Sequence, residues 1–489
     1  MLDLGNVPLL SKDRTEGMPF VCAGGPCAYN PEPLADFIDF FMMGEGEEII
    51  CEVMDIYALW KKAKRPRIEF LEEIAKLEGV YVPCFYDVLY NDDNTIKSIA
   101  PNNPNAKGTI KKRIILDMDK VYYPKKFVVP NIGIVHDRIM LEVFRGCTRG
   151  CRFCQAGIIY RPVRERSSKH LTELAKELIK NTGYEELSMT SLSTSDYTEL
   201  PVLCENLIEL TKENHINLTL PSLRIDNFSL EIMSKVRHAG LTFAPEAGTQ
   251  RLRDVINKNI TEEDVVSSTS LAFNGGYSGV KLYFMLGLPT ETDEDVEGIA
   301  SLASLVLSQY YTIPKDKRPR GLSITVSTSC FVPKPHTPFQ WEPMDNIDEL
   351  ERKQKILQGA IKQRQIKYNW HDADLSYLEA VFARGDRRLC KAMLKAFEKG
   401  FHFDSWSEHF SFEGWMEVFR ECGIDSDFYV TRRRDIEEIL PWEHIDVGVT
   451  KEFLKRELKK AYNAQTTAEC RTSCSGCGAA RFKGGVCVG

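Results

Sequence analysis

The sequence lacks any long uncharged apolar run, and its apolar stretches fall short of the about 18 residues that indicate a membrane span. The opening residues, MLDLGNVPLLSKDR, also lack the basic region and apolar core of a secretory signal peptide. Cysteine is too sparse for a secreted disulfide scaffold, with 15 among 489 residues. These absences predict a reduced, cytoplasmic protein that has no membrane partner.

An excess of charge of one sign is absent too. The chain carries 63 basic and 70 acidic residues, a formal charge of -7, and so has no global electrostatic footprint for nucleic acid. Low-complexity tracts are missing as well, whereas a hydrophobic content of 43% is enough for packed cores. Disordered and fibrous classes are therefore excluded, and any nucleic-acid binding would have to be local.

The chain does contain, between residues 138 and 332, apolar strand-like runs that alternate with amphipathic helical segments such as 169–181 and 230–239. The six runs are 139–144, 186–192, 216–222, 241–247, 279–286 and 322–331. Six β/α repeats predict an α/β fold with a parallel sheet curled into a partial (β/α)6 barrel. The chemistry of such a fold is expected at the carboxyl ends of its strands.

The segments on either side differ from this pattern. Strand-like runs at 19–25 and 37–44, followed by a helical pattern, predict a fragment of a doubly wound α/β domain, and we expect the chain to begin within that domain. After residue 345 helical patterns dominate, with Thr450 as the expected N-cap of a helix over 450–462. The predicted regions are 1–75 (the α/β fragment), 76–135 (a linker with short strands), 136–345 (the barrel core) and 346–489 (a mainly helical region ending in a cysteine cluster).

Two groups of cysteines share one spacing. The first, in RGCTRGCRFCQ, comprises Cys147, Cys151 and Cys154, directly after the first predicted strand of the barrel. One buried helical face would explain this spacing, but Gly146, Gly150 and the interspersed arginines argue against a helix there. Three thiols without a nearby fourth ligand favour a metal that keeps one position open for a small molecule. The second group comprises Cys470, Cys474 and Cys477, with Cys487 beyond them.

The first group resembles the cluster motif of the radical S-adenosylmethionine (SAM) superfamily, because the Cys-x3-Cys-x2-Cys spacing and the aromatic Phe153 lie in the loop after the first strand of a six-fold β/α domain. The resemblance implies that the three thiolates hold a 4Fe-4S cluster and that SAM chelates its fourth iron. It also implies an electron donor, a 5′-deoxyadenosyl radical that abstracts hydrogen from substrate, and a place for Phe153 beside the adenine.

Two further segments at strand ends are candidates for holding SAM. SLSTSDY (191–197) stands where the family usually has a glycine-rich stretch and an acidic residue, and it offers Ser193, Ser195 and Asp196; a polar helix cap is the alternative. FAPEAGTQR resembles a segment of the branch that contains methylthiotransferases and cobalamin-dependent radical enzymes. It implies that Glu246 accepts from ribose or amino groups and that Arg251 pairs with the cofactor carboxylate. A capped helix start with a surface arginine would also explain it.

The ends of the chain leave alternatives open. The segment GGPCAYNPEPLADFIDFFMMGEGEE resembles the last third of cobalamin-binding domains. The first strands of such a domain are expected to be missing, and the cobalt-ligating Asp-x-His-x-x-Gly signature, which many such enzymes do without, is missing too, so cobalamin binding stays open. The terminal cysteines 470, 474, 477 and 487 suit a second cluster, a zinc ion or a frayed tail. The basic stretches RGDRR (384–388) and TRRR (431–434) are expected to be solvated surface rather than phosphate contacts.

The resemblance predicts a radical SAM enzyme that functionalises a C-H bond of an unknown substrate, with methyl or methylthio transfer to RNA or a ribosome-linked target as the leading hypothesis. Lys334, His336 and Gln340, in PKPHTPFQ after the sixth predicted strand, are candidates for contacting substrate, although a histidine between prolines is often a satisfied turn residue. The alternative of another class is a zinc-stabilised nucleic-acid-binding protein without catalysis, in which both cysteine groups are structural.

Overall fold

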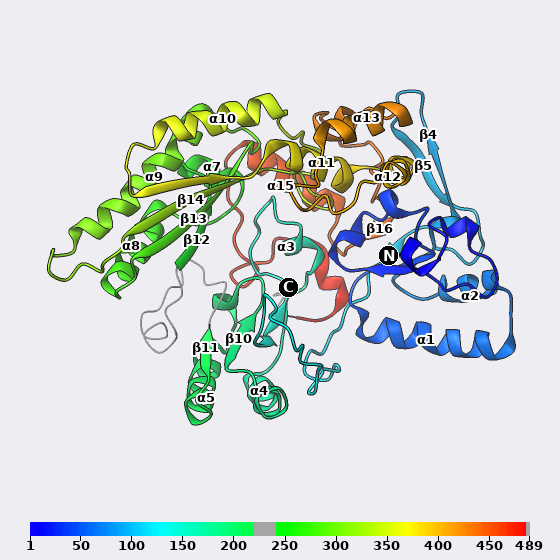
Figure 1. The fold of residues 1–489 in the computed structure, drawn as a ribbon, viewed down its shortest axis with the longest axis horizontal. Helices are drawn as coiled ribbons and strands as arrows, with labels where there is room; N and C mark the ends of the chain where they lie inside the picture. Colours follow the sequence, from blue (N-terminus) through cyan, green and yellow to red (C-terminus); the bar gives the residue numbers. More distant parts are fainter. Residues whose placement is uncertain (220–240, 486–489) are drawn as a thin grey trace. The chain divides into compact units, whose positions relative to one another are not determined.

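The computed structural model describes residues 1–219 and 241–485, which form two compact units built from interleaved parts of the chain (Figure 1). Unit 1 comprises Met1–Ile115, Val332–Ile347 and Asp372–Val449, and unit 2 comprises Leu116–Phe331, Asp348–His371 and Thr450–Gly489. Because the units follow spatial contacts rather than chain order, the four regions expected from the sequence remain a prediction. Among the helices in these two described ranges, none is long and apolar enough to cross a membrane.

Unit 2 contains the strands expected for the β/α pattern. They are β7 (Ile139–Glu142), β10 (Glu186–Thr190), β11 (Asn217–Thr219), β12 (Leu241–Glu246), β13 (Gly279–Leu286) and β14 (Ser323–Cys330). They form two parallel sheets, in the orders β11-β10-β7 and β12-β13-β14-β15, and the described residues do not pair one sheet with the other. The helix expected at 230–239 and the end of the strand expected at 216–222 lie outside the described residues.

Strand β15 (Ile366–Trp370) lies in the region after residue 345, which is mainly helical as predicted. It runs parallel to β14 as the outer strand of its sheet, and the Tyr368 hydroxyl and Thr328 Oγ1 lie 2.9 Å apart across the pair. Its sequence, IKYNW, is five residues long and only Ile366 in it is buried. Such a short edge strand has almost no periodic signal, so the pairing with β14 decides its conformation.

Helices cover these sheets through their apolar faces. Leu171, Leu174 and Leu178 share the buried face of α4 (Ser168–Thr182) and pack in the core of β7, β10 and β11. This helix starts at Ser167, whose side chain accepts from the His170 N-H, and ends at Gly183 with φ 70°. The other helices of unit 2 are α3 (Ala156–Ile159), α5 (Leu200–Glu213), α7 (Gln250–Val255), α8 (Glu262–Asn274), α9 (Asp293–Thr312), α10 (Ile347–Ala360) and α15 (Lys451–Tyr462). The side chain of Thr450 caps α15 as predicted, accepting from the Phe453 N-H.

Unit 1 contains the expected α/β fragment. Strands β1 (Cys22–Gly24) and β2 (Phe40–Met42) are parallel, and β3 (Val80–Tyr81) is antiparallel to β2. Its other elements are α1 (Gly46–Ala63), α2 (Arg67–Ile74), β4 (Tyr86–Tyr90), β5 (Ile96–Pro101), β6 (Ile110–Lys111), α11 (Ala373–Arg384), α12 (Leu389–Glu398), α13 (Phe412–Cys422), α14 (Asp427–Val430) and β16 (Ile445–Asp446). Helix α1 buries Ile49 and Val53.

Short one- or two-turn segments and a small ribbon complete both units. The 3-10 helices are η1 (Asp3–Gly5), η2 (Ser11–Asp13), η3 (Pro26–Tyr29), η4 (Glu32–Leu34), η5 (Pro83–Phe85), η6 (Thr194–Asp196) and η8 (Ala479–Phe482). The ribbon pairs β8 (Phe144–Arg145) with β9 (Arg164–Glu165) in antiparallel fashion. It holds the two ends of the loop that carries the first cysteine group.

The basic stretch RGDRR is not the solvated surface expected from the sequence. Arg384 and Asp386 are buried, and Arg387 binds the buried Glu32, with its Nε 2.9 Å from Glu32 Oε2. The Tyr81 hydroxyl donates to the same carboxylate at 2.5 Å. Glu32 precedes Arg387 by 355 residues, so no local pattern could indicate the pair. In TRRR the expectation is half right, because Arg433 is exposed whereas Arg434 is buried.

Candidate metal and cofactor site

The first cysteine group lies in a loop of unit 2 that leaves β8 and enters α3. The loop begins at Gly146, which has φ 93°, and a Cβ there would lie 2.8 Å from the Tyr160 carbonyl oxygen. Only glycine suits this backbone conformation and spacing. Cys147, Cys151 and Cys154 are half-buried in the loop, and none is in a disulfide.

The three thiols lie close enough to affect one another's ionisation. Burial, and after it the charge of the neighbouring Cys151, raises the pKa of Cys147 to about 12. Burial and then Cys151 also raise the pKa of Cys154, whose Sγ accepts from the Gly157 N-H at 3.3 Å. A bound cation would stabilise the charged forms of Cys147 and Cys154, because metal ligation displaces the protons of thiols.

The donor set of this loop is compatible with a cluster. Among the residues that the structure describes, no three histidine, cysteine, aspartate or glutamate side chains converge as ligands of one metal ion. In a 4Fe-4S cluster each thiolate binds its own iron atom, so the three thiolates stand farther apart than the ligands of one zinc ion. Three free thiols in one loop have the number and type of ligands that such a cluster takes.

A buried arginine fixes the loop from the inside. The Arg152 side chain is fully buried, and its Nε donates to Glu457 at 3.1 Å. Its other two nitrogens donate to three carbonyl oxygens, those of Asp254 (3.0 Å), Val255 (2.8 Å) and Gln465 (2.6 Å). The guanidinium thereby joins the cysteine loop to the end of α7 and to the segment after α15.

Phe153 and Glu246, two residues predicted to contact the cofactor, are brought together by Lys258. The Lys258 ammonium pairs with Glu246 Oε1 at 3.1 Å and lies 5.9 Å from the centre of the Phe153 ring. The charges of Lys258 and Glu246 also affect the pKa of the Cys154 thiol. Lys258 was missed in the sequence because it lies in a loop after α7, where a lysine gives no distinctive signal.

Glu246 has an unusual backbone. Its φ is 68°, in the left-handed region that non-glycine residues seldom adopt, and the register of β12 against β13 shifts between Phe243 and Glu246. Such a conformation costs about 1 kcal/mol or more and persists where the surroundings require it, often at functional sites. Here it turns the carboxylate at the end of β12 toward Lys258.

In the SLSTSDY segment, the side chain of Asp196 is fixed by several hydrogen bonds. Arg149, from the cysteine loop, donates to its two oxygens from Nε at 3.0 Å and from Nη2 at 2.6 Å, and Ser193 Oγ donates to it at 2.7 Å. Ser193 and Asp196 are both buried, and Ser195 lies in the same 3-10 helix η6. The structure therefore joins this segment to the cysteine loop through Arg149.

Arg251 has partners within the protein. It forms an ion pair with the buried Asp295 and donates to the Thr290 carbonyl at 2.8 Å. Asp295 also forms the capping box of α9 with Thr292. The arginine thus ties α7 to the start of α9.

Two of the terminal cysteines, Cys470 and Cys477, lie near the cysteine loop within unit 2. The Cys470 N-H donates to the Thr148 carbonyl at 2.9 Å, and the Thr450 N-H donates to the Cys477 carbonyl at 3.0 Å. Burial alone would lower the pKa of Arg161, but the thiols of Cys470, Cys477 and then Cys147 raise it above its ordinary value. Cys474 is exposed, and Cys487 lies outside the described residues.

The residues PKPHTPFQ belong to unit 1 and contact other residues of that unit. His336 Nε2 lies 2.9 Å from the Tyr29 carbonyl oxygen, and burial lowers the pKa of this histidine to about 4. Gln340 Oε1 accepts from the Trp442 Nε1-H at 2.8 Å, and Lys334 pairs with Glu379. These contacts match the alternative expectation, a histidine satisfied within a turn.

Comparisons with known proteins show which family the chain resembles. The family model of the radical SAM superfamily matches residues 141–303, which include the cysteine loop, and the model of the N-terminal region of radical SAM proteins matches residues 1–83. An uncharacterized protein of Methanocaldococcus jannaschii is 32% identical over 394 residues, covering 80% of this chain and 77% of that protein.

More distant relatives have named activities. The ribosomal protein uS12 methylthiotransferase RimO of Treponema denticola is 24% identical over 283 residues, covering 48% of this chain and 58% of that protein. The solved structure of the radical SAM methyltransferase TsrM from Kitasatospora setae, with cobalamin and a 4Fe-4S cluster bound, has a TM-score of 0.42 at 15% identity, over 63% of this chain and 56% of that one. The chain therefore spans little more than half of each of these two proteins.

Proposed function

The chain belongs to the radical SAM superfamily, whose members are enzymes that use a 4Fe-4S cluster and SAM, and we propose that Cys147, Cys151 and Cys154 hold that cluster here. When bound, the cluster supplies an electron that cleaves SAM to a 5′-deoxyadenosyl radical, which takes hydrogen from a C-H bond of the substrate. This membership sets aside the alternative of a zinc-stabilised protein without catalysis. The observation that carries the proposal is the gathering of Phe153, Glu246 and Lys258 next to Cys154.

The surrounding residues have chemistry that suits SAM. The Glu246 carboxylate is an acceptor for ribose hydroxyls or the amino group, and Lys258 holds it in place. The face of Phe153 offers an apolar surface for adenine. Ser193, Ser195 and Asp196 add hydroxyl and carboxylate groups after β10, at the end of the strand next to β7. Arg251 is the remaining candidate for the cofactor carboxylate, although Asp295 and Thr290 already accept from it.

The reaction that we propose is methyl or methylthio transfer to RNA or to a ribosome-linked target, with a separate electron donor that reduces the cluster. RimO of Treponema denticola, whose name states methylthio transfer to ribosomal protein uS12, supports this choice through 24% identity over 283 residues. A cytoplasmic location suits both an intact cluster and the described cysteines, which are free of disulfides. Cobalamin binding by unit 1 stays a prediction.

A second metal site is proposed at Cys470, Cys474, Cys477 and Cys487, for a further iron-sulfur cluster or a zinc ion. The support is the place of Cys470 and Cys477 next to Arg161, whose charge opposes the burial that raises the pKa of the Cys470 thiol. Metal analysis of the Cys474→Ala variant distinguishes the two metals, since loss of zinc alone indicates a zinc ion and loss of iron a cluster.

The test of the main proposal is formation of 5′-deoxyadenosine. The protein is purified without oxygen, supplied with iron and sulfide, and mixed with SAM and a strong reductant. We expect 5′-deoxyadenosine and methionine from the natural protein, and neither from the Cys151→Ala variant, which should also lose its iron-sulfur absorbance. Cys51→Ala is the matched control, because Cys51 is an exposed cysteine on α1. Equal product from Cys151→Ala and the natural protein would refute the assignment.

A further inference from the structure

One face of the sheet formed by strands β12 to β15 of unit 2 carries exposed polar side chains. Successive side chains of a strand point to opposite faces, and in β13 the buried Val280, Leu282 and Phe284 alternate with the exposed Lys281 and Tyr283. The buried side chains pack in a core with helices α8, α9 and α10 (Figure 1). Lys281 and Tyr283 therefore belong to the opposite face, which we call the polar face of this sheet.

The register of the strands brings two lysines together on the polar face. Lys281 of β13 is the partner of Thr325 in β14, and Thr325 is the partner of Lys367 in β15. Neighbouring strands lie about 4.8 Å apart, so the backbones of the two lysines are about 10 Å apart, with Thr325 between them. Both lysines are exposed. Their long, flexible side chains can therefore reach the same ligand over Thr325.

Neither lysine has a counter-charge within residues 1–219 and 241–485. In these two ranges no carboxylate forms an ion pair with Lys281 or Lys367, and neither ammonium group makes a hydrogen bond. The carboxylate at the end of β12, that of Glu246, is paired with Lys258 at 3.1 Å. The whole chain has a formal charge of -7, but the two lysines give the polar face a local positive charge that suits an anionic ligand.

A second row of side chains lies two residues further along the same strands. Here Tyr283, which is 41% exposed, is the partner of Ser327 in β14, and Ser327 is the partner of Asn369 in β15. A strand rises about 3.3 Å per residue, so this row lies about 7 Å from the lysines, toward the edge of the sheet where β12 ends at Glu246. Nucleic-acid bases stack on exposed aromatic rings, and serine and asparagine can hydrogen-bond to base edges or to a 2′-hydroxyl group.

We propose that the polar face binds the substrate of the radical chemistry and that this substrate is RNA, with phosphate at Lys281 and Lys367 and a base at Tyr283. The inference rests on the proposed function, and it chooses RNA over a ribosome-linked protein. Lysine binds phosphate as a point charge, and single-stranded RNA combines phosphates with bases that stack. A basic protein would be repelled by two unpaired ammonium groups. Because Tyr283 lies nearer than the lysines to Glu246, the base carries the C-H bond that reacts.

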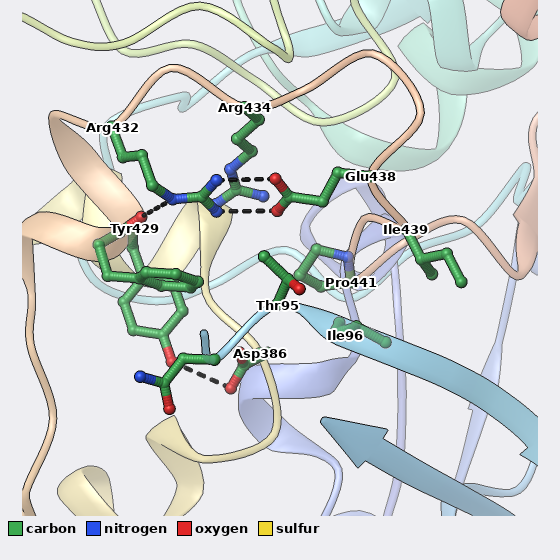
Figure 2. Close-up of a pocket in the computed structure, with 11 residues that line it drawn as sticks. Thr95, Ile96, Asp386, Tyr429, Arg432, Arg434, Glu438, Ile439 and Pro441 are labelled. Atoms are coloured by element: carbon green, nitrogen blue, oxygen red, sulfur yellow. Dashed lines mark hydrogen bonds and ion pairs between the residues drawn. The ribbon is translucent and has the colours of Figure 1, made fainter. Parts of the chain in front are cut away.

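Two arginines of the stretches RGDRR and TRRR, by contrast, are held by carboxylates. Figure 2 shows the two parallel contacts of Arg432 with Glu438, at 2.7 Å and 2.8 Å. Arg388 pairs at 2.6 Å with Asp386, which lines the pocket drawn in the same figure. Such an ion pair must be disrupted before its arginine can bind phosphate with both edges, so Lys281 and Lys367 are the better phosphate contacts.

Binding of a short fluorescent single-stranded RNA of mixed sequence to the reconstituted protein tests this proposal, with fluorescence anisotropy measured at several salt concentrations. Each lysine that contacts a phosphate steepens the slope of log affinity against log salt concentration by about 0.7. We therefore expect Lys281→Gln and Lys367→Gln each to weaken binding at least threefold and to reduce the slope by about 0.7. Tyr283→Ala should weaken binding about fivefold or more and leave the slope unchanged, because stacking releases no counterions. Lys97→Gln is the matched control, since Lys97 is an exposed lysine on β5 in unit 1, and it should bind within twofold of the natural protein.

The proposal is overturned if the natural protein does not bind this RNA, or if all three variants bind with the affinity and the salt slope of Lys97→Gln. Either result would favour a protein as the target. The RNA measurement needs neither SAM nor a reductant, whereas formation of 5′-deoxyadenosine by the natural protein without RNA tests the proposed function. A protein that forms 5′-deoxyadenosine but does not bind RNA therefore refutes this inference alone, and one that binds RNA as expected but forms no 5′-deoxyadenosine refutes the radical chemistry.

Discussion

Replacing Arg152 by methionine tests whether the cysteine loop depends on the segment after α15. The substitution keeps an apolar stem of similar length but removes the guanidinium, and with it the hydrogen bonds to Glu457, to Asp254 and Val255, and to Gln465. Removing one partner of a buried ion pair typically costs about 3–5 kcal/mol. Glu457 keeps Lys460 at 3.2 Å and Thr467 at 2.9 Å, so we expect the lower value, about 3 kcal/mol.

The free energy of unfolding is measured by urea denaturation, and local opening by amide hydrogen exchange. The amide of Cys470, which donates to the Thr148 carbonyl, should exchange faster in Arg152→Met. Arg456→Met is the matched control, because Arg456 also bonds to the terminal segment, at the Gly476 carbonyl, but is exposed. It should cost less than about 1 kcal/mol.

A double variant separates the effect of removing Arg152 alone from the effect of removing the whole Arg152–Glu457 pair. In Arg152→Met combined with Glu457→Leu, the buried carboxylate that lost its arginine is removed as well, and we expect the double variant to be more stable than Arg152→Met alone. If Arg152→Met is no less stable than Arg456→Met and its Cys470 amide exchanges at the natural rate, the terminal segment does not depend on this arginine, and the argument fails.

Three further predictions concern pH and backbone conformation. Burial lowers the pKa of His336 and of His444 to about 4, whereas unfolded histidine titrates near 6.5. Between these two pH values the unfolded state binds more protons than the folded state. The free energy of unfolding should therefore fall as pH drops from about 6.5 to about 4, by roughly 3 kcal/mol for each histidine. Urea denaturation over this pH range is the measurement, and His444→Gln should flatten the pH profile. Glu246→Gly relieves the left-handed backbone but removes the Lys258 pair, so stability should change by less than about 1 kcal/mol while formation of 5′-deoxyadenosine falls at least tenfold; unchanged product would exclude Glu246 from the site. Gly146→Ala should cost about 2 kcal/mol or more and lower the iron content, because its Cβ would meet the Tyr160 carbonyl oxygen at 2.8 Å; normal iron content would contradict this.

The sequence predicts what depends on local patterns. Strand β13 occupies the predicted residues 279–286, and α15 begins after the predicted cap Thr450, because apolar runs and N-caps are properties of neighbouring residues. Contacts between distant residues are not such properties. The pairing of Arg387 with Glu32 spans 355 residues, and arginines in an acidic protein are usually solvated, so the wrong expectation for RGDRR follows from missing tertiary information.

In the candidate site, too, the sequence predicts local features but not contacts between distant residues. Cys147, Cys151 and Cys154 were recognisable because a fixed spacing in one loop is a local feature. Lys258 was not, although the structure brings it to Glu246 and Phe153. The role of Lys258 depends on Glu246, twelve residues earlier, and on the Phe153 ring in another loop, and only the fold brings these residues together.

The three residues that follow α7 explain why the parts of the site depend on one another. The Ile256 carbonyl accepts from the Arg152 N-H at 3.0 Å, Asn257 donates to the Gly150 carbonyl at 3.0 Å, and Lys258 holds Glu246. Asn257 also binds the backbone of Thr467 in both directions, at 2.7 Å and 3.2 Å. One short segment thus contacts the cysteine loop, Glu246 and the terminal segment. Because Asn257 is fully buried, no solvent can replace its hydrogen bonds, so a shift of the terminal segment must also move the loop that carries the cysteines.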